Sequence, residues 1–124
     1  MQPMLSTESG FTPLECAVLD AICSKQGTER TAFEAQLSAA TVLRRENTGA
    51  GFCTYLSVER SSNAPLGGER HRRGPAVQID GLKHGMGFVL WLKEGYADCL
   101  EGYCYDERTT GIAFEQVPFE LLQP

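Results

Sequence analysis

Apolar residues early in the chain recur at helical spacing. Between residues 12 and 25 they return every three or four positions, which predicts a helix with one buried stripe. The segment Thr12-Pro13-Leu14-Glu15 predicts its start, because it combines a capping hydroxyl, a proline in the first turn and a glutamate three residues after the cap. The similar segment Thr31-Ala32-Phe33-Glu34 predicts a second, shorter helix that ends near Ala39.

After residue 40 the apolar pattern alternates and glycine becomes frequent. Phe52, Leu56 and Val58 share one face of the segment 51–58, which is typical of a half-buried strand. Further strands are expected at residues 41–46, 75–80, 86–93 and 96–105, and residues 112–122 are expected to add an edge strand. The predicted fold class is α+β, with two N-terminal helices packed on one face of a mainly antiparallel sheet of about four to six strands.

The 124 residues are expected to form one domain, since the chain is long enough to bury a core and no linker interrupts it. Residues 1–11 are expected to be disordered. Residues 60–74 are rich in serine and glycine, lack periodicity and contain the basic run Arg70-His71-Arg72-Arg73. This stretch predicts an exposed, mobile loop.

The composition is that of an ordinary globular protein, with 42% hydrophobic residues, 22% charged residues and a mean hydropathy of -0.23. The longest apolar stretch, residues 87–92, is far shorter than the roughly 20 residues of a membrane helix, and no secretory signal is evident. Five cysteines without a Cys-x-x-Cys pair favour free thiols. We therefore expect a cytoplasmic protein without a membrane partner.

Acidic residues are concentrated toward the end of the sequence. Residues 94–124 carry seven acidic residues against one basic residue, whereas residues 1–93 carry nine acidic and ten basic residues. Excess charge of one sign attracts partners of the other sign. A basic protein is therefore the expected partner. Nucleic acid is not expected, because the basic run is isolated on an acidic chain and lacks interleaved aromatic residues.

The predicted hairpin at residues 86–105 combines acidic and aromatic side chains, a mixture that suits protein recognition. The residues expected to bind a protein partner are Glu94, Asp98, Glu101, Tyr103 and Tyr105. Since no catalytic motif is recognisable, the first hypothesis is a non-catalytic binding module, comparable to an immunity protein or antitoxin that holds a nuclease-like toxin.

An enzyme is the second hypothesis. His84 with Asp80 or Asp98 could form a ligand site or the acid-base pair of a small hydrolase, because a carboxylate can orient a histidine that titrates near neutral pH. Asp80-Gly81 and His84-Gly85 are also ordinary turn sequences. The third hypothesis is a structural or dimer-forming protein whose aromatic face is a symmetric contact.

Metal and cofactor sites are not expected. Cys99, Cys104, His71 and His84 have suitable ligand types for zinc, but they lack the short paired spacings of structural zinc sites. The glycines between residues 81 and 102 do not form a phosphate-binding motif followed by a helix.

Residues 80–91 (DGLKHGMGFVLW), with the continuation Glu94-Gly95-Tyr96-Ala97-Asp98 and Leu100-Glu101-Gly102-Tyr103-Cys104-Tyr105, resemble a group of small bacterial proteins that carries no settled activity. The likeness extends over residues 37–107. A Trp-Pro pair that often follows the Leu-Glu-Gly-Tyr segment in that group is absent here. The resemblance implies a compact, stand-alone cytosolic protein and supplies no catalytic residue.

Overall fold

The structure is a computed structural model that describes residues 10–122. The disorder expected for residues 1–11 concerns mainly residues outside this range. Within it, the side chain of Phe11 is 2% exposed and belongs to the core, so the prediction is wrong for this residue. A single aromatic residue ahead of the first helix has no periodic neighbour that would reveal its burial.

The described chain contains two helices, two short 3-10 turns and seven strands. The helical elements are α1 (Pro13–Cys23), η2 (Gly27–Glu29), α2 (Arg30–Ala39) and η3 (Arg60–Ser62). The strands are β1 (Thr41–Asn47), β2 (Gly51–Ser57), β3 (His71–Arg73), β4 (Val77–Ile79), β5 (Met86–Lys93), β6 (Tyr96–Cys104) and β7 (Phe119–Leu121). Neither helix in this part of the chain is long and apolar enough to cross a membrane.

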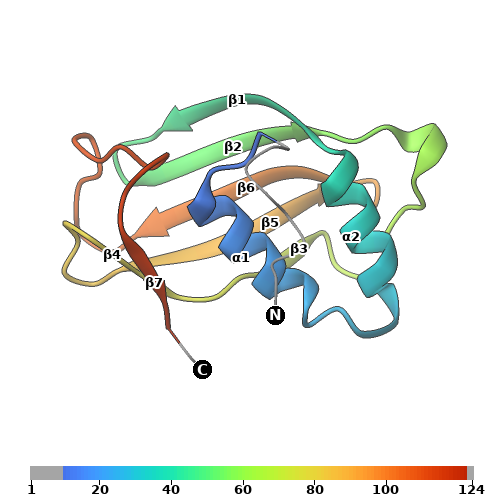
Figure 1. Cartoon of the computed structure of the whole chain (residues 1–124), viewed down its shortest axis with the longest axis horizontal. Helices are drawn as coiled ribbons and strands as arrows, with labels where there is room; N and C mark the ends of the chain where they lie inside the picture. The colour runs from blue at the N-terminus through green and yellow to red at the C-terminus, as the bar shows by residue number, and fades with distance from the viewer. Residues whose placement is uncertain (1–9, 123–124) are drawn as a thin grey trace.

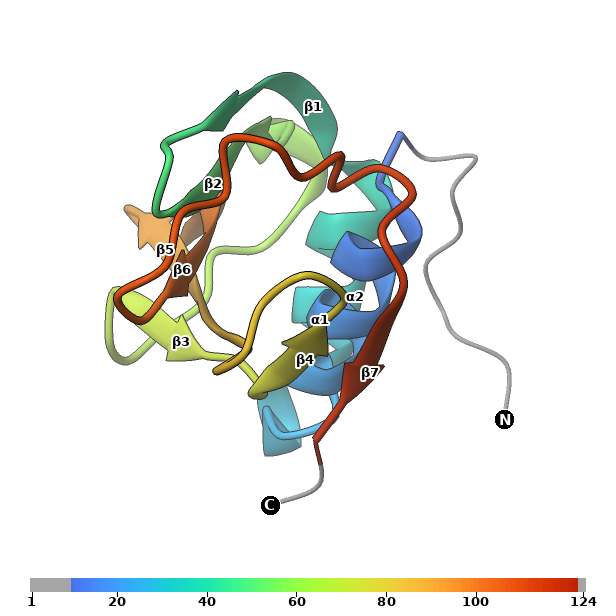
Figure 2. The same ribbon diagram turned by 90° about the vertical axis from the view of Figure 1, so that its left-hand side faces the viewer.

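The strands form one antiparallel sheet in the order β1-β2-β6-β5-β4-β7, and β3 shares an edge of β5 with β4. The α+β prediction is thus confirmed, with one strand more than expected. Both helices lie on the same face of the sheet (Figure 1). The sheet curls around them, so that β2, β6 and β5 lie to one side of the helices while β4 and β7 lie at one end of the molecule, nearest the viewer in Figure 2.

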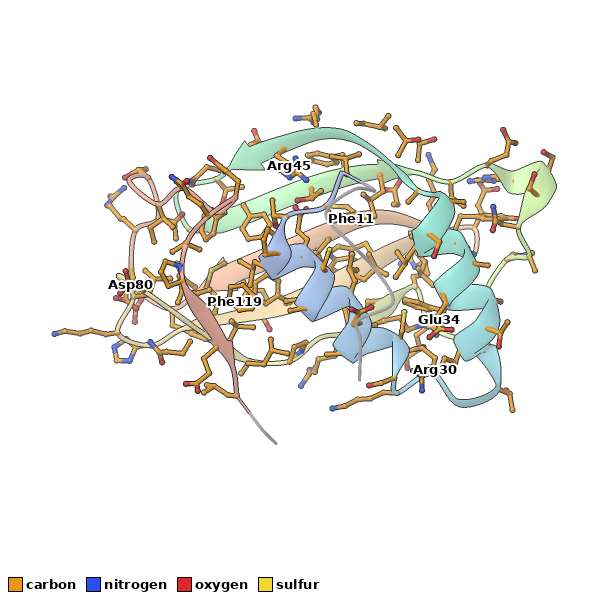
Figure 3. The ribbon with its side chains drawn as sticks, viewed as in Figure 1. Phe11, Arg30, Glu34, Arg45, Asp80 and Phe119 are labelled. Atoms are coloured by element: carbon orange, nitrogen blue, oxygen red, sulfur yellow. The ribbon has the colours of Figure 1, made fainter. Side chains whose placement is uncertain are left out.

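The first helix begins as its sequence predicts. The backbone N–H of Glu15 donates to the Thr12 hydroxyl at 3.1 Å, and the Glu15 carboxylate accepts from the Thr12 N–H at 2.9 Å. The second predicted capping box is wrong, because the N-cap of α2 is Glu29, two residues before Thr31, and it makes no side-chain cap hydrogen bond. Its glutamate, Glu34, instead pairs with Arg30 one turn away at 3.0 Å (Figure 3).

An ion pair between an exposed arginine and a buried glutamate fixes α1 against the sheet. The carboxylate of Glu15 is fully buried and accepts hydrogen bonds from Arg45 Nε at 2.9 Å and Arg45 Nη2 at 2.8 Å. The hydroxyl of Thr54 on β2 also donates to this carboxylate. Arg45 therefore reaches from β1 across the sheet edge to the start of the helix (Figure 3).

Gln36 fixes α2 in a similar way. Its amide nitrogen donates to the carbonyl oxygens of Ala64 and Gly95 at 2.8 and 2.9 Å, and its amide oxygen accepts from the N–H of Ala97 at 2.9 Å. The side chain is 1% exposed. One glutamine thus joins a helix, a long connection and the turn between β5 and β6, which determines where that hairpin lies.

The segment after β6 is attached to the turn between β1 and β2. Thr109 is fully buried, and its hydroxyl donates to Asn47 Oδ1 at 2.9 Å and accepts from the Gly51 N–H at 3.0 Å. Further along, the ring of Phe114 lies 4.5 Å from that of Phe52, measured between centroids. This segment therefore contributes to the core before the chain reaches β7.

The region 60–74 has more structure than its sequence predicts. His71–Arg73 forms β3 and pairs with β5, so the predicted loop is wrong for these residues. Arg72 points toward the helices and donates to Gln26 Oε1 at 2.6 Å. The strand escapes sequence detection because its pattern is polar on both faces and its pairing partner lies later in the chain.

Candidate functional site: the open face of the sheet

The face of β1, β2, β6, β5 and β3 that points away from the helices has no helix over it (Figure 2). We call it the open face. On β2, β6 and β5, every second side chain points inward and is buried, as in Phe52, Leu100 and Leu90. The residues between them are available to solvent to varying degrees and decide what the open face can bind.

Strand register arranges the open face into two rows that each cross five strands. The first row, here called the aromatic row, contains Arg44, Tyr55, Cys99, Trp91 and His71. The second, here called the mixed row, contains Glu46, Cys53, Glu101, Val89 and Arg73. Aromatic, sulfur-containing and charged groups from distant parts of the sequence therefore meet on one surface.

Neighbouring side chains hold the rings of the aromatic row. The guanidinium carbon of Arg44 lies 4.0 Å from the centroid of the Tyr55 ring, which is a cation-π contact. The rings of His71 and Trp91 have centroids 5.9 Å apart. Trp91 nevertheless remains 42% exposed, so a large aromatic surface is fixed in place and still accessible.

The two rows are joined by hydrogen bonds from rings to carboxylates. The indole N–H of Trp91 donates to Glu101 Oε1 at 2.9 Å, and the Tyr55 hydroxyl donates to Glu46 Oε1 at 3.5 Å. Each acid on this face thus has an aromatic donor from the other row. The shorter of these bonds fixes one oxygen of Glu101 and leaves its remaining acceptor capacity toward solvent.

A pair of tyrosines extends the face beyond Glu101. Tyr103 lies between Gly51 and Gly87 in the register, and a Cβ atom at Gly87 would lie 2.5 Å from the Tyr103 ring. The ring of Tyr105 meets that of Tyr103 edge to face, with 5.8 Å between centroids. Their exposed fractions are 36% and 51%. In the described chain, the two cation-π contacts involve other rings, and the cation that acts on Tyr103 is Arg73, whose charge opposes the rise in the pKa of this tyrosine that burial causes.

The five residues predicted to bind a protein fall into two groups at opposite ends of β6. Glu101, Tyr103 and Tyr105 are close together at one end of the open face. Glu94 occupies the turn at the other end of β6 and forms an ion pair with Arg60 at 3.4 Å. Asp98 lies toward that same end, where it lines a pocket of about 260 Å³.

The acidic end of the sequence does not become one acidic surface. Glu107 lies in the segment after β6 and accepts hydrogen bonds from the backbone N–H groups of Lys83 and His84, both at 2.9 Å. These two bonds hold the pKa of its carboxyl below the ordinary value. Glu120 is on β7, at the far edge of the sheet. Charge that is contiguous in sequence is thus distributed over several sides of the molecule.

Asp98 is separated from the other two residues of the predicted enzyme site, whereas Asp80 and His84 lie in the same loop between β4 and β5. Asp80 follows β4 at the end of the molecule opposite α2 (Figure 3). His84 lies in the loop before β5, next to the strand end where Met86 pairs with Cys104, whereas Asp98 is near the other end of β6. Within residues 10–122, no hydrogen bond or ion pair joins the His84 ring to a carboxylate.

The four residues considered as metal ligands are also separated. Cys99 and His71 lie in the aromatic row on either side of Trp91, while Cys104 and His84 are at the opposite end of the hairpin. Across the described residues, no three His, Cys, Asp or Glu side chains are grouped as a metal site requires.

Sequence reasoning missed Tyr55 and Arg44 as members of the same surface. Alternation along β2 and β5 indicates which residues share a face within each strand. The relation between the strands depends on a register that joins residues more than forty positions apart, such as Tyr55 and Cys99. Local pattern carries no information on that register.

The geometry of the open face has to be interpreted from its own chemistry. The chain matches no protein-family model, no curated protein and no solved structure. The likeness of residues 37–107 to small bacterial proteins therefore stays a prediction.

Proposed function

We propose that this protein is a non-catalytic protein-binding module whose open face holds an arginine- or lysine-bearing segment of a basic protein. The observation that carries the proposal is the arrangement of Tyr103, Tyr105 and Glu101: two exposed rings outside the cation-π contacts of the described residues, beside a carboxylate that accepts from Trp91. A module of this kind would act as an inhibitor of the immunity or antitoxin type in the cytoplasm.

The chemistry of a guanidinium ion suits this arrangement. Such a group stacks on an aromatic face and donates to a carboxylate in the same plane, and a charge-assisted bond of this kind is stronger than a neutral one. The molecule already contains the stacking half of this interaction, where Arg44 lies over Tyr55. At an exposed site the stacking contributes about 0.5–1 kcal/mol, so several such contacts are needed for stable binding.

Charge supports the choice of a basic partner. The chain carries a net charge of -5, and Glu94 and Asp98 lie at the rim of the face instead of its centre. Rim charges mainly raise the association rate and its dependence on salt. Central aromatic contacts determine the dissociation rate, since buried tyrosine and tryptophan side chains dominate binding free energies at interfaces.

The first test compares capture of proteins from the organism's own lysate by three immobilised forms. These are the wild type, the face variant Tyr103→Ser/Tyr105→Ser, and the control Leu122→Ser, which removes an exposed apolar side chain beyond β7. We expect a stoichiometric basic protein on the wild type and the control that is lost from the face variant and released by high salt.

The second test uses the purified partner and titration calorimetry. Glu101→Gln is expected to weaken binding at least roughly tenfold, equivalent to about 1.4 kcal/mol, and to reduce the salt dependence. Glu120→Gln, an equal change of charge on β7, should leave the affinity within about twofold. Equal binding by wild type and face variant, or a partner without basic character, would contradict the proposal.

Self-association through the same aromatic surface is the third hypothesis, and it gives a different result. Sedimentation of the wild type would then show a dimer, and Tyr103→Ser/Tyr105→Ser would convert it to a monomer. A wild type that sediments as a monomer at all accessible concentrations leaves the open face to another protein.

A further inference from the structure

Two of the five cysteines lie next to each other on the open face. Cys53 in β2 pairs with Glu101, and Tyr55 in β2 pairs with Cys99 in β6. The two cysteines are thus offset by two residues on adjacent strands and point to the same side of the sheet. Such diagonal neighbours have Cα atoms about 7–8 Å apart, with their side chains somewhat closer.

The other three cysteines lie elsewhere. Cys16 and Cys23 belong to α1 and pack in the core on the helical side of the sheet. Cys104 is at the end of β6, where its thiol donates to the carbonyl oxygen of Glu107 at 3.0 Å. A shared face and adjacent strands distinguish Cys53 and Cys99 from every other pair of thiols.

The two thiols of this pair differ in accessibility. Cys53 is half-buried, whereas Cys99 is 8% exposed. Burial raises the pKa of Cys99 to about 12, and the neighbouring Cys53 contributes to the shift. Cys53 is also the largest cause of the raised pKa of Tyr55. Cys53 therefore lies close to both side chains and is the thiol that a small oxidant reaches first.

We propose that Cys53 and Cys99 form a dithiol modification site that hydrogen peroxide oxidises to an intramolecular cross-strand disulfide. In the first step the Cys53 sulfur attacks one peroxide oxygen, the O–O bond breaks, and a sulfenic acid and one water are formed. In the second step the Cys99 sulfur attacks the Cys53 sulfur. The S–O bond breaks, and the departing hydroxide takes the thiol proton to give a second water. The two thiols are oxidised together by two electrons and one peroxide is reduced.

The geometry makes this disulfide reversible. Unstrained disulfides join residues whose Cα atoms are usually about 4.4–6.8 Å apart, so β2 and β6 have to approach slightly at this point. A strained disulfide is more easily reduced than a relaxed one and is typical of regulatory bonds. Its formation alters Cys99, which lies opposite Tyr55 in the aromatic row, and Cys53, which lies opposite Glu101 in the mixed row.

The test treats the fully reduced wild-type protein with hydrogen peroxide, blocks the remaining thiols, and maps the products by mass spectrometry. We expect a monomer lighter by two hydrogen atoms, a linked peptide that contains Cys53 and Cys99, and full reversal by dithiothreitol. In Cys99→Ser, which lacks the second thiol, dimedone should trap a sulfenic acid at Cys53. Cys104→Ser is the control and should form the disulfide as the wild type does.

Mapping of the linked peptides in the oxidised wild type tests the proposal even if one of the variants folds poorly. A linked peptide from a different cysteine pair, a disulfide between two chains, or oxygen addition without a linked peptide would overturn the proposal. A free-thiol peptide in the same sample serves as a control for the oxidant. If that peptide is oxidised while the mass of the protein stays unchanged, the proposal is overturned as well.

Discussion

Gly51 on β2 and Gly102 on β6 lie so close together that a Cβ atom on Gly51 would be 1.9 Å from the Gly102 carbonyl oxygen. Gly51 also has a φ angle of +137°, which residues with a side chain rarely adopt. Gly51→Ala is therefore expected to destabilise the protein severely, by about 3 kcal/mol or more, or to prevent folding. Thermal unfolding followed by circular dichroism measures the effect.

Gly111 is a matched control for this substitution. Its added Cβ would meet nothing within 4 Å, and its φ angle is not positive. Gly111→Ala should leave stability within about 0.5 kcal/mol of the wild type. Equal stability of the two alanine variants would contradict the close approach of β2 and β6.

The ion pair between Glu15 and Arg45 predicts strong coupling between α1 and β1. Arg45→Met leaves a buried carboxylate without its cation and should reduce the free energy of unfolding by about 2–4 kcal/mol. Glu15→Gln/Arg45→Met removes both charges, so it should lose less than the sum of the two single changes. Urea unfolding of the four proteins in a double-mutant cycle measures this coupling, and simple additivity would argue against the pair.

Trp91 is the single tryptophan of the chain and reports on the open face. Its ring is 42% exposed in the free protein. Binding of a partner to this face should shift its emission to shorter wavelength and protect it from acrylamide quenching, because the ring leaves water. Saturation with partner without any change in emission or quenching would place the contact on another surface.

Buried thiols predict a loss of stability at alkaline pH. Burial is the main cause that raises the pKa of Cys16 to about 11 and of Cys23 to about 12, from 9.0. Between these values the unfolded chain releases protons that the folded protein retains, so stability present below pH 9 falls as pH rises toward 11 and 12. Urea unfolding with reductant at about pH 8 and about pH 10 measures the slope, which should be smaller in Cys23→Ala.

Glu107 predicts the opposite dependence at acid pH. Backbone N–H groups of Lys83 and His84 hold the pKa of its carboxyl below 4.5. The stability from these bonds is therefore complete above pH 4.5 and is lost as pH falls through the lowered pKa. Glu107→Gln should be less stable than the wild type near neutral pH, and the difference should shrink in acid. A difference independent of pH would contradict a role for the charged carboxylate.

Features set by local chemistry could be predicted from the sequence. The capping box at Thr12 and Glu15 involves residues three positions apart, and the hairpin of β5 and β6 is joined by a short turn with glycine. Both are confirmed. β3 could not be predicted, because three polar residues gain strand structure solely from their pairing with Val89, Leu90 and Trp91.

In the candidate site, too, the residues placed by local strand geometry could be predicted and those placed by long-range pairing could not. Glu101, Tyr103 and Tyr105 lie close together because every second residue of a strand points to the same side. Asp98 has the other parity, and the pairing is irregular between Trp91 and Leu92, so it falls at the rim. Tyr55 joins the surface through a pairing of β2 with β6 that depends on the complete fold.

The order of strands in the sheet also limits how the chain can fold during synthesis. β2 has β1 on one side, but its other neighbour is β6, and three more strands are made between them. Until β6 leaves the ribosome, the apolar stripe of α1 lacks much of the sheet that covers it. Contacts so distant in sequence slow folding, so the core of this protein is expected to close only after its last long strand has been made.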